Sequence, residues 1–536
     1  MGAITPDDLR RLLDSDDPVA VIDVREPLDY TTGNVRESTL LPRRALEWRL
    51  PELLPRPDVP VVLVDGAGER AATDADWLRW LGLPNVRHLA GGVAAWRAAG
   101  YDVVEAEGDV LASAFNVPSK EFGEQVAVER DPERVEPERL AEWLAGDEDV
   151  VVADVRTPAE YREETLPGAR NVEGVDLALY AEALREDPET KLVVHCAGRT
   201  RSLIGIATLG ERDLDEVYGL ENGTSGWQLA GFDLEEGAEP GDAPDLSPAE
   251  RERAESFAED LIADHAIARL STDEVAAALG DDELAQVVDV RPREAFEAGH
   301  LPGAVGVPGG QAIQRADDYV AVPEATLVFY ADGIVRPAVT AAWYARMGYE
   351  NVAILDGGMD AWTEEGRPVE TGSERTERLG LQRAVEQRHG CGEPLGRDRV
   401  ADAAPTVAPA DLDPDDATIL YVGRSLDYPD GHLPGSRWVS RNDVGDLLDR
   451  ERPENVVLTC ADGEVSAYAA AALAHVGYDV RALGGGVAAW EAAGRPVETG
   501  EDGIGDRRDR VPTKAELGED VMRGYLEWEE ELGHEG

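Results

Sequence analysis

Cys196 lies in a stretch whose residue types favour a reactive thiolate. In KLVVHCAGRTRS, residues 191–202, an apolar run ends at the cysteine, a glycine-bearing loop with Arg199 and Arg201 follows, and apolar periodicity starts at Ser202. This order predicts a buried strand, a tight loop and a helix. A cysteine at the carboxyl end of such a strand faces the loop amides and the positive end of the next helix, and both favour the thiolate. We therefore predict that Cys196 is a nucleophile in an anion-binding loop.

Other residues of this loop are candidates for holding an anionic substrate. Arg199 and Arg201 supply charge, and Gly198 permits backbone conformations and close approach that other residues do not. His195 precedes the cysteine, but its side chain points to the opposite face of the strand. Upstream, Arg156 ends another apolar run, and it either faces the pocket or forms a local ion pair, with Glu160 as the candidate partner.

Internal repetition shows how these residues are positioned. A glycine-then-tryptophan phrase occurs four times, and its tryptophans Trp96, Trp227, Trp362 and Trp490 are 131, 135 and 128 residues apart. An Asp-Val-Arg phrase ends an apolar run in the first three copies, at Asp23, Asp154 and Asp289, and reads Tyr421-Val422-Gly423 in the fourth. The chain is therefore an array of four copies of one unit.

The position of Cys196 differs among the copies. Equivalent loops start at Asp65, Cys196, Tyr330 and Cys460, which lie 31, 31, 32 and 30 residues before the respective tryptophans. Copies one and three therefore lack a thiol at this position. The fourth loop carries Asp462 and Glu464, whose charge disfavours a thiolate. Cys460 and the connector residue Cys391 are secondary candidates for carrying a reactive thiol.

Strand and helix signals alternate within each copy. Short, nearly continuous apolar strands alternating with helices predict an α/β fold, here four tandem three-layer α/β/α domains with mostly parallel sheets. Thr5 before Pro6, and Ser271 with Glu274, are predicted helix caps, and Ser247 with Glu250 begins a helix within a connector. We predict domains at 1–105, 131–236, 266–371 and 403–500, followed by an acidic C-terminal helix at 501–536 that docks on a neighbouring domain.

Composition limits the class of function. The 536 residues carry a formal net charge of −59 with only three lysines, so the surface repels nucleic acid and anionic lipid. No apolar run is long enough to cross a membrane and the N-terminus lacks a signal core, so we expect a cytoplasmic protein. Acidic, lysine-poor composition resembles that of halophilic proteins. Three cysteines and eight histidines supply too few ligands for a structural metal site, and no metal or other cofactor is expected.

Together these motifs resemble the rhodanese family. Asp154-Val155-Arg156, Leu166-Pro167-Gly168, the Cys196 loop and the glycine-tryptophan phrase follow the family's order, and the second copy is the most similar. The resemblance implies a thiosulfate sulfurtransferase with four rhodanese-like domains, of which the second is catalytic. By this resemblance Cys196 takes a sulfur from a small anionic donor as a persulfide. It then passes that sulfur to cyanide or to a thiol, a sulfur-carrier protein being a further candidate acceptor. Gly198, Arg199, Thr200, Arg201 and Arg156 are the predicted substrate-binding residues.

Three alternatives stay open on sequence grounds. A cysteine phosphatase or arsenate reductase has five residues between its cysteine and arginine, whereas four separate Cys196 from Arg201. A non-catalytic scaffold or sulfur-binding module is compatible with the altered loops of three copies. A mercaptopyruvate-specific enzyme fits less well, because Cys196-Ala197-Gly198-Arg199 differs from the Cys-Gly-Ser/Thr-Gly typical of that group.

Overall fold

The computed structural model describes residues 2–185, 187–212, 214–280, 283–372, 394–512 and 514–534. Internal contacts divide the chain into two compact units. Unit 1 comprises Met1–Ala106 with Arg378–Thr513, and unit 2 comprises Glu107–Glu377 with Lys514–Gly536. Unit 1 therefore contains the first and fourth repeats, and unit 2 contains the second and third.

Each repeat forms a sheet of five strands, and the strand order is the same in all four. In the first repeat this order is β1-β5-β4-β2-β3, and the pairings in all four sheets are parallel. The strands are β1 (Ala3–Ile4), β2 (Ala20–Asp23), β3 (Thr39–Leu40), β4 (Val61–Val64) and β5 (Val86–Leu89); β6 (Arg134–Val135), β7 (Val150–Asp154), β8 (Arg170–Asn171), β9 (Lys191–His195) and β10 (Val217–Leu220); β11 (Ala268–Leu270), β12 (Ala285–Asp289), β13 (Val305–Gly306), β14 (Thr326–Tyr330) and β15 (Val352–Leu355); and β16 (Thr406–Val407), β17 (Thr418–Tyr421), β18 (Arg437–Trp438), β19 (Val456–Thr459) and β20 (Val480–Leu483). The predicted α/β fold with four tandem domains is confirmed.

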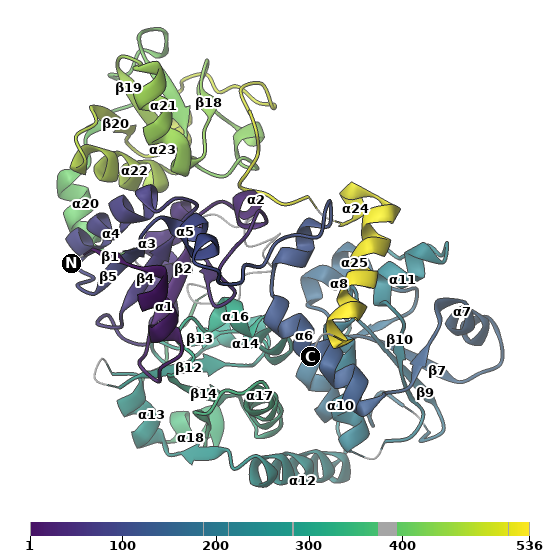
Figure 1. Ribbon diagram of the computed structural model, residues 1–536. Coiled ribbons are helices and arrows are strands. Elements are labelled where there is room, and N and C mark those ends of the chain that lie inside the picture. Colours follow the sequence, from purple (N-terminus) through teal and green to yellow (C-terminus); the bar gives the residue numbers. More distant parts are fainter. Residues whose placement is uncertain are drawn as a thin grey trace. The chain divides into compact units, whose positions relative to one another are not determined.

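Helices connect and cover the strands (Figure 1). The helix after each cysteine-equivalent loop is α4 (Glu69–Leu81), α10 (Thr200–Glu211), α17 (Val335–Arg346) or α22 (Glu464–His475), and the tryptophan helices are α5 (Gly92–Ala98), α11 (Gly223–Leu229), α18 (Gly358–Glu364) and α23 (Gly486–Ala492). The remaining α-helices are α1 (Pro6–Leu13), α2 (Pro27–Tyr30), α3 (Leu46–Leu53), α6 (Val117–Arg130), α7 (Pro137–Ala145), α8 (Pro158–Glu163), α9 (Leu177–Tyr180), α12 (Pro248–Asp264), α13 (Thr272–Ala278), α14 (Arg293–Ala298), α15 (Gly309–Gln314), α16 (Ala316–Tyr319), α20 (Arg397–Ala403), α21 (Val444–Glu451), α24 (Lys514–Leu517) and α25 (Glu519–Glu531).

The predicted helix starts are confirmed. The Thr5 side chain accepts a hydrogen bond from the Asp8 amide, and Ser271 and Ser247 each form a reciprocal capping box with the glutamate three residues on. Each of the four repeated tryptophans is buried, and its indole donates to the carbonyl six residues later. The tryptophans therefore hold the end of their helix against the segment that follows it.

The two repeats within each unit pack through equivalent elements. In unit 1, Arg441 of the fourth repeat donates to Glu47 of the first over 2.8 Å. In unit 2, Trp343 of α17 donates to the Thr208 hydroxyl of α10 over 2.9 Å, and Arg336 pairs with Asp176. Each unit is therefore held together by buried polar contacts as well as by apolar packing.

Two segments differ from the sequence prediction. The connector around 106–130 contains α6, which packs on α10. The single C-terminal helix predicted for 501–536 is limited to α24 and α25, and residues 501–512 contain no helix. A Gly-x-Gly pair and Pro512 disfavour a helix there. As predicted, α25 does dock on the folded protein, where it packs on α6 (Figure 1). Within the described chain, no helix combines the length and the apolar character needed to cross a membrane.

Candidate active site

Cys196 follows β9 directly and lies beneath the loop that leads to α10. Its side chain is only 2% exposed, and its Sγ lies 3.5 Å from the hydroxyl of Ser202 in the first turn of α10. In open α/β sheets, ligands bind beyond the carboxyl ends of the strands. The structure thus places Cys196 at the strand end and helix start that the sequence predicted.

The segment with the glycine-tryptophan phrase binds the backbone of this loop. The Thr224 amide donates to the Cys196 carbonyl over 2.9 Å, and the Ser225 amide donates to the Ala197 carbonyl over 3.2 Å. Gly223 has a φ of +56°, and a Cβ there would collide with the Cys196 carbonyl. The glycine-tryptophan phrase and the cysteine-equivalent loop recur together along the chain because the backbone of the first binds the backbone of the second.

Gly198 lacks one of the two properties predicted for it. It does not adopt the left-handed conformation for which we expected a glycine, whereas Gly68 and Gly463 do so one position later in the loops of unit 1. Gly198 is buried, and its carbonyl lies against Gly223, where a Cβ would meet it. The glycine whose missing side chain lets these two backbone segments approach each other is therefore Gly223.

Arg199 is held by carboxylates from several elements. Its guanidinium donates to Glu124 of α6 over 2.7 Å, to Glu221 over 2.6 Å and to Glu530 of α25 over 2.8 Å. Burial opposes the charge, but Glu124 and its neighbours outweigh burial and raise the pKa of Arg199. Arg199 therefore stays charged while its donors are shared among acids.

Arg201 forms an ion pair with Glu160. The sequence had suggested Glu160 as a partner for Arg156 instead. Both terminal nitrogens of Arg201 donate to the Glu160 carboxylate over 2.8 Å. Burial would raise the pKa of Glu160, but Arg201 outweighs it and lowers that pKa far below the ordinary range. The Nε of Arg201 is buried and has no hydrogen-bond partner among the described residues.

Arg156 forms its ion pair with Asp154. Its Nε donates to Asp154 over 3.0 Å, and the pair is repeated as Arg25 with Asp23 and Arg291 with Asp289 in the repeats that lack a cysteine. His195 Nε2 lies 3.8 Å from Asp154, on the face opposite the thiol, and burial lowers its pKa. Asp154 thus fixes the base of the site, and Arg156 lies in this structural pair.

The first repeat contains an anion in the equivalent loop. The carboxylate of Asp65, the counterpart of Cys196, accepts hydrogen bonds from the amides of Gly68, Arg70 and Ala71, the latter two over 2.9 Å. By position, these amides correspond to those of Arg199, Arg201 and Ser202. Successive amides at a loop and helix start form an anion-binding concavity. A loop of this sequence spacing therefore surrounds a negative charge at the position of the cysteine.

The fourth repeat presents its cysteine in a less favourable setting. The Ser466 amide donates to Cys460 Sγ over 3.4 Å, but the Asp462 carboxylate lies 3.5 Å from the same sulfur. Burial and then Asp462 raise the pKa of Cys460 to about 11. Tyr421 and Gly423 replace the Asp-Arg pair beside it.

Cys460 should therefore be a slow nucleophile near neutral pH. We expect its alkylation by iodoacetamide to rise with pH until the solution approaches pH 11, and Asp462→Asn to shift this profile to lower pH by removing the repulsion. Peptide mapping by mass spectrometry gives the rate at each cysteine. An unchanged profile in Asp462→Asn would show that burial alone controls this thiol.

The remaining candidates are a tyrosine and a third cysteine. Tyr330, the counterpart of Cys196 in the third repeat, is fully buried, and its hydroxyl accepts a hydrogen bond from the Leu301 amide over 3.0 Å. Cys391 lies outside the described residues.

The sequence missed the elements that cover the Cys196 loop. The Thr200 hydroxyl donates to Glu529 of α25 over 3.1 Å, and Glu124, Glu529 and Glu530 all reach the loop from segments outside the repeat. The only sequence signal was the apolar periodicity of the tail, which predicts docking but not the place. Burial raises the pKa of Tyr525, also on α25, and the charges of Glu529 and Cys196 add to this rise.

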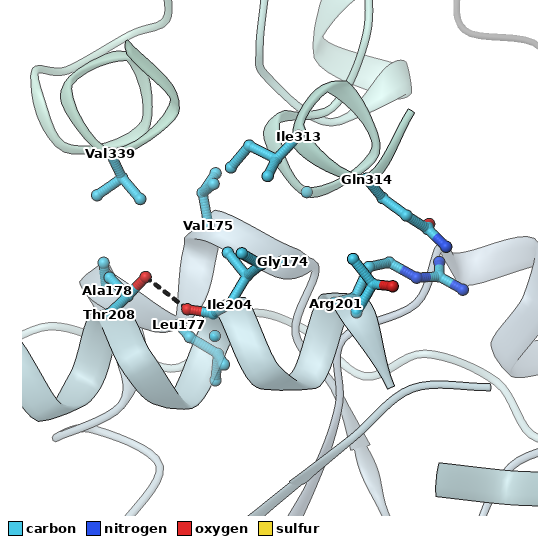
Figure 2. Close-up of a pocket in the computed structure, with 13 residues that line it drawn as sticks. Gly174, Val175, Leu177, Ala178, Arg201, Ile204, Thr208, Ile313, Gln314 and Val339 are labelled. Carbon is cyan, nitrogen blue, oxygen red and sulfur yellow. Dashed lines mark hydrogen bonds between the residues drawn. The ribbon is translucent and has the colours of Figure 1, made fainter. Parts of the chain in front are cut away.

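Behind the loop, α10 of the second repeat packs against the third repeat. Figure 2 shows Ile204 and Thr208 of α10 facing Ile313 and Val339 of the third repeat. The cavity between them is about 10 Å³, room for at most one water molecule. Gln311 of α15 also donates to Glu160 over 3.3 Å. The third repeat thus supports the residues that position Arg201.

Comparison with known proteins agrees with this architecture. The model of the rhodanese-like domain matches residues 5–99, 136–230, 271–365 and 406–493. A crystal structure of a thiosulfate sulfurtransferase from Pseudomonas aeruginosa is 32% identical with a TM-score of 0.83, over 100% of this chain and 97% of that one.

Curated relatives cover smaller parts of the chain. SseB of Mycobacterium tuberculosis, provisionally named a thiosulfate sulfurtransferase, is 26% identical over 42% of this chain and 95% of its own length. The thiosulfate sulfurtransferase GlpE of Pseudoalteromonas translucida is 33% identical over 15% of this chain and 80% of its own length. With four matched domains and a relative similar along the whole chain, this protein belongs to the rhodanese family, as a four-domain member of the sulfurtransferase type.

Proposed function

We propose that the second repeat transfers a sulfane sulfur from thiosulfate, or a similar anionic donor, to a thiophilic acceptor through a persulfide on Cys196. The observation that carries this proposal is the Asp65 loop, in which backbone amides bind an anion at the position that Cys196 occupies in the second repeat. The names of the relatives support thiosulfate as the donor.

The reaction consists of two displacements at sulfur. The Cys196 thiolate attacks the outer sulfur of thiosulfate, a new S–S bond forms, and the old S–S bond breaks with its electron pair leaving on sulfite. An acceptor such as cyanide or a thiolate then attacks the outer sulfur of the persulfide. The electron pair of that bond returns to Cys196, which restores the thiolate.

The loop amides have the main electrostatic role in both steps. Donors fixed in a water-poor site stabilise charge without having to reorganise. The amides of Arg199, Arg201 and Ser202 would face the sulfur, as their counterparts face Asp65. No separate base is required if the cysteine reacts as a thiolate.

Arg201 is the side chain best placed to bind the donor, and Thr200 stays a prediction because its hydroxyl donates to Glu529. Arg201 keeps a buried Nε–H without a partner among the described residues. Arg199 keeps its positive charge but shares its donors among carboxylates, so the sulfur donor would have to displace one of them to bind this guanidinium. Cys460 and Cys391 remain predictions as secondary thiols.

A sulfite burst tests the proposal. Without an acceptor, each protein molecule is expected to release one sulfite when mixed with excess thiosulfate. The persulfide forms in the first step and accumulates because nothing removes its outer sulfur. A rapid assay for sulfite measures the amplitude, and Cys196→Ser is the control. Steady release without a burst, or a burst that survives in Cys196→Ser, would rule out the mechanism.

A further inference from the structure

The C-terminal helix α25 lies directly on the loop that contains Cys196. Glu530 accepts a hydrogen bond from Arg199 over 2.8 Å, and Glu529 accepts one from Thr200 over 3.1 Å. The first donor ends the loop and the second begins α10, three and four residues after the cysteine. The helix is thus part of the wall of the site, although it comes from the other end of the chain.

An aromatic clamp holds α25 in this place. Lys120 Nζ of α6 lies 5.0 Å from the ring centroid of Tyr525 and 5.1 Å from that of Trp528, and it donates to the Ala112 carbonyl over 2.8 Å. Lys120 is one of only three lysines in the chain, and it is buried. Cation–π contacts of a desolvated ammonium group are among the stronger ones.

The helix also places buried negative charge where an anionic donor must bind. Glu529 is 2% exposed, and its Oε2 has no hydrogen-bond partner among the described residues. Glu529 and the three carboxylates that pair with Arg199, those of Glu124, Glu221 and Glu530, place four acidic groups on this side of the loop. A dianion entering this loop meets repulsion as long as α25 stays in place.

From these contacts we infer that α25 is a gate of the Cys196 site, and that Glu530 and the anionic sulfur donor compete for Arg199. With the helix in place, the guanidinium of Arg199 is shared by carboxylates of α6 and α25, above a cysteine residue that is itself buried. A donor that reaches Cys196 must displace the helix, and its negative charge replaces that of Glu530 on the guanidinium. This inference rests on the proposed function for the identity of the donor, but not for the movement of the helix.

The gate should respond to salt. Glu530 is half-exposed, so added salt screens its attraction to Arg199 more than it screens the buried pair of Arg199 with Glu124. Raising the KCl concentration should therefore open the site, and Glu530→Gln should make opening less dependent on salt.

Alkylation of Cys196 by neutral iodoacetamide measures opening without any sulfur transfer. The full-length wild type is compared with Glu530→Gln, with Lys120→Met and with Glu527→Gln, which removes the same charge from an exposed position on α25. We expect Cys196 to react about fivefold faster in Glu530→Gln and Lys120→Met than in the wild type. Glu527→Gln should match the wild type, and the KM for thiosulfate should fall in Glu530→Gln.

Wild-type alkylation rates at Cys196 in both Glu530→Gln and Lys120→Met would overturn the inference. A parallel rise at Cys460 would also overturn it, because it would indicate general loosening rather than a local gate. Failure of the proposed function looks different. In that case Cys196 is exposed faster in the variants as expected, but no variant gains a sulfur from thiosulfate.

Discussion

Replacing Cys196 by serine is expected to lower kcat/KM for transfer from thiosulfate to cyanide by about a thousandfold or more. Serine has nearly the same shape and keeps a polar contact to Ser202, so the fold should be preserved. A hydroxyl is not ionised near neutral pH and cannot hold a persulfide, so the whole covalent route is lost. Thiocyanate formation, followed in a colorimetric assay, measures the rate.

The other two cysteines provide the controls for this variant. Cys460→Ser should leave the rate nearly unchanged, because burial and Asp462 raise the pKa of Cys460 to about 11 and keep that thiol protonated. Cys391→Ser is expected to behave similarly. Full activity in Cys196→Ser together with loss in Cys460→Ser would assign catalysis to the fourth repeat instead.

The second large effect concerns the Glu160–Arg201 pair. Glu160→Gln is expected to destabilise unit 2 by about 3 kcal/mol, because it leaves the buried guanidinium of Arg201 without its counter-charge. It also weakens the capping box at Thr157, in which Glu160 accepts from the Thr157 amide over 3.1 Å. Urea unfolding of the full chain, followed by tryptophan fluorescence, measures the change.

A double variant separates the lost charge from other effects. Glu160→Gln combined with Arg201→Met should recover most of the stability, since removing both charges leaves no unpaired ion. Glu239→Gln is the matched control in the same unit, because its pair with Arg162 is exposed and should matter by less than about 0.5 kcal/mol. Equal losses in the single and double variants would show that the carboxylate does not act through Arg201.

The same pair predicts a dependence on pH. The pKa of Glu160 is lowered in the folded protein, so its contribution is complete above the unfolded value of about 4.3 and declines as the pH falls below it. The stability gap between wild type and Glu160→Gln should therefore narrow in acid. A gap that stays constant down to strongly acidic pH would contradict the ion-pair explanation.

Much of the fold was predictable because the same local sequence signals occur in each of the four repeats. Apolar strands, capping residues such as Ser271, and glycines before each tryptophan helix are local signals. The place of Cys196 at the end of β9 follows from this order alone. Gly198 shows the limit, because which glycine of a loop turns left-handed depends on the segments packed against it.

The partners of the charged loop residues were not predictable. Arg199 is bound by Glu124 and Glu530, which lie 75 and 331 residues away in sequence, and neither belongs to a repeated motif. In the sequence, Asp65 is recognisable only as the residue that stands at the cysteine position of the first repeat. Its meaning became clear when the amides of Arg70 and Ala71 were found to point at it.

Mass spectrometry after exposure to thiosulfate identifies the cysteine that accepts the sulfur. The protein is treated with thiosulfate without an acceptor, digested and mapped for a gain of one sulfur atom at each cysteine. We expect the gain at Cys196, its absence in Cys196→Ser, and its reversal by cyanide. A sulfur found only at Cys460 or Cys391, or a normal gain in Cys196→Ser, would contradict this expectation.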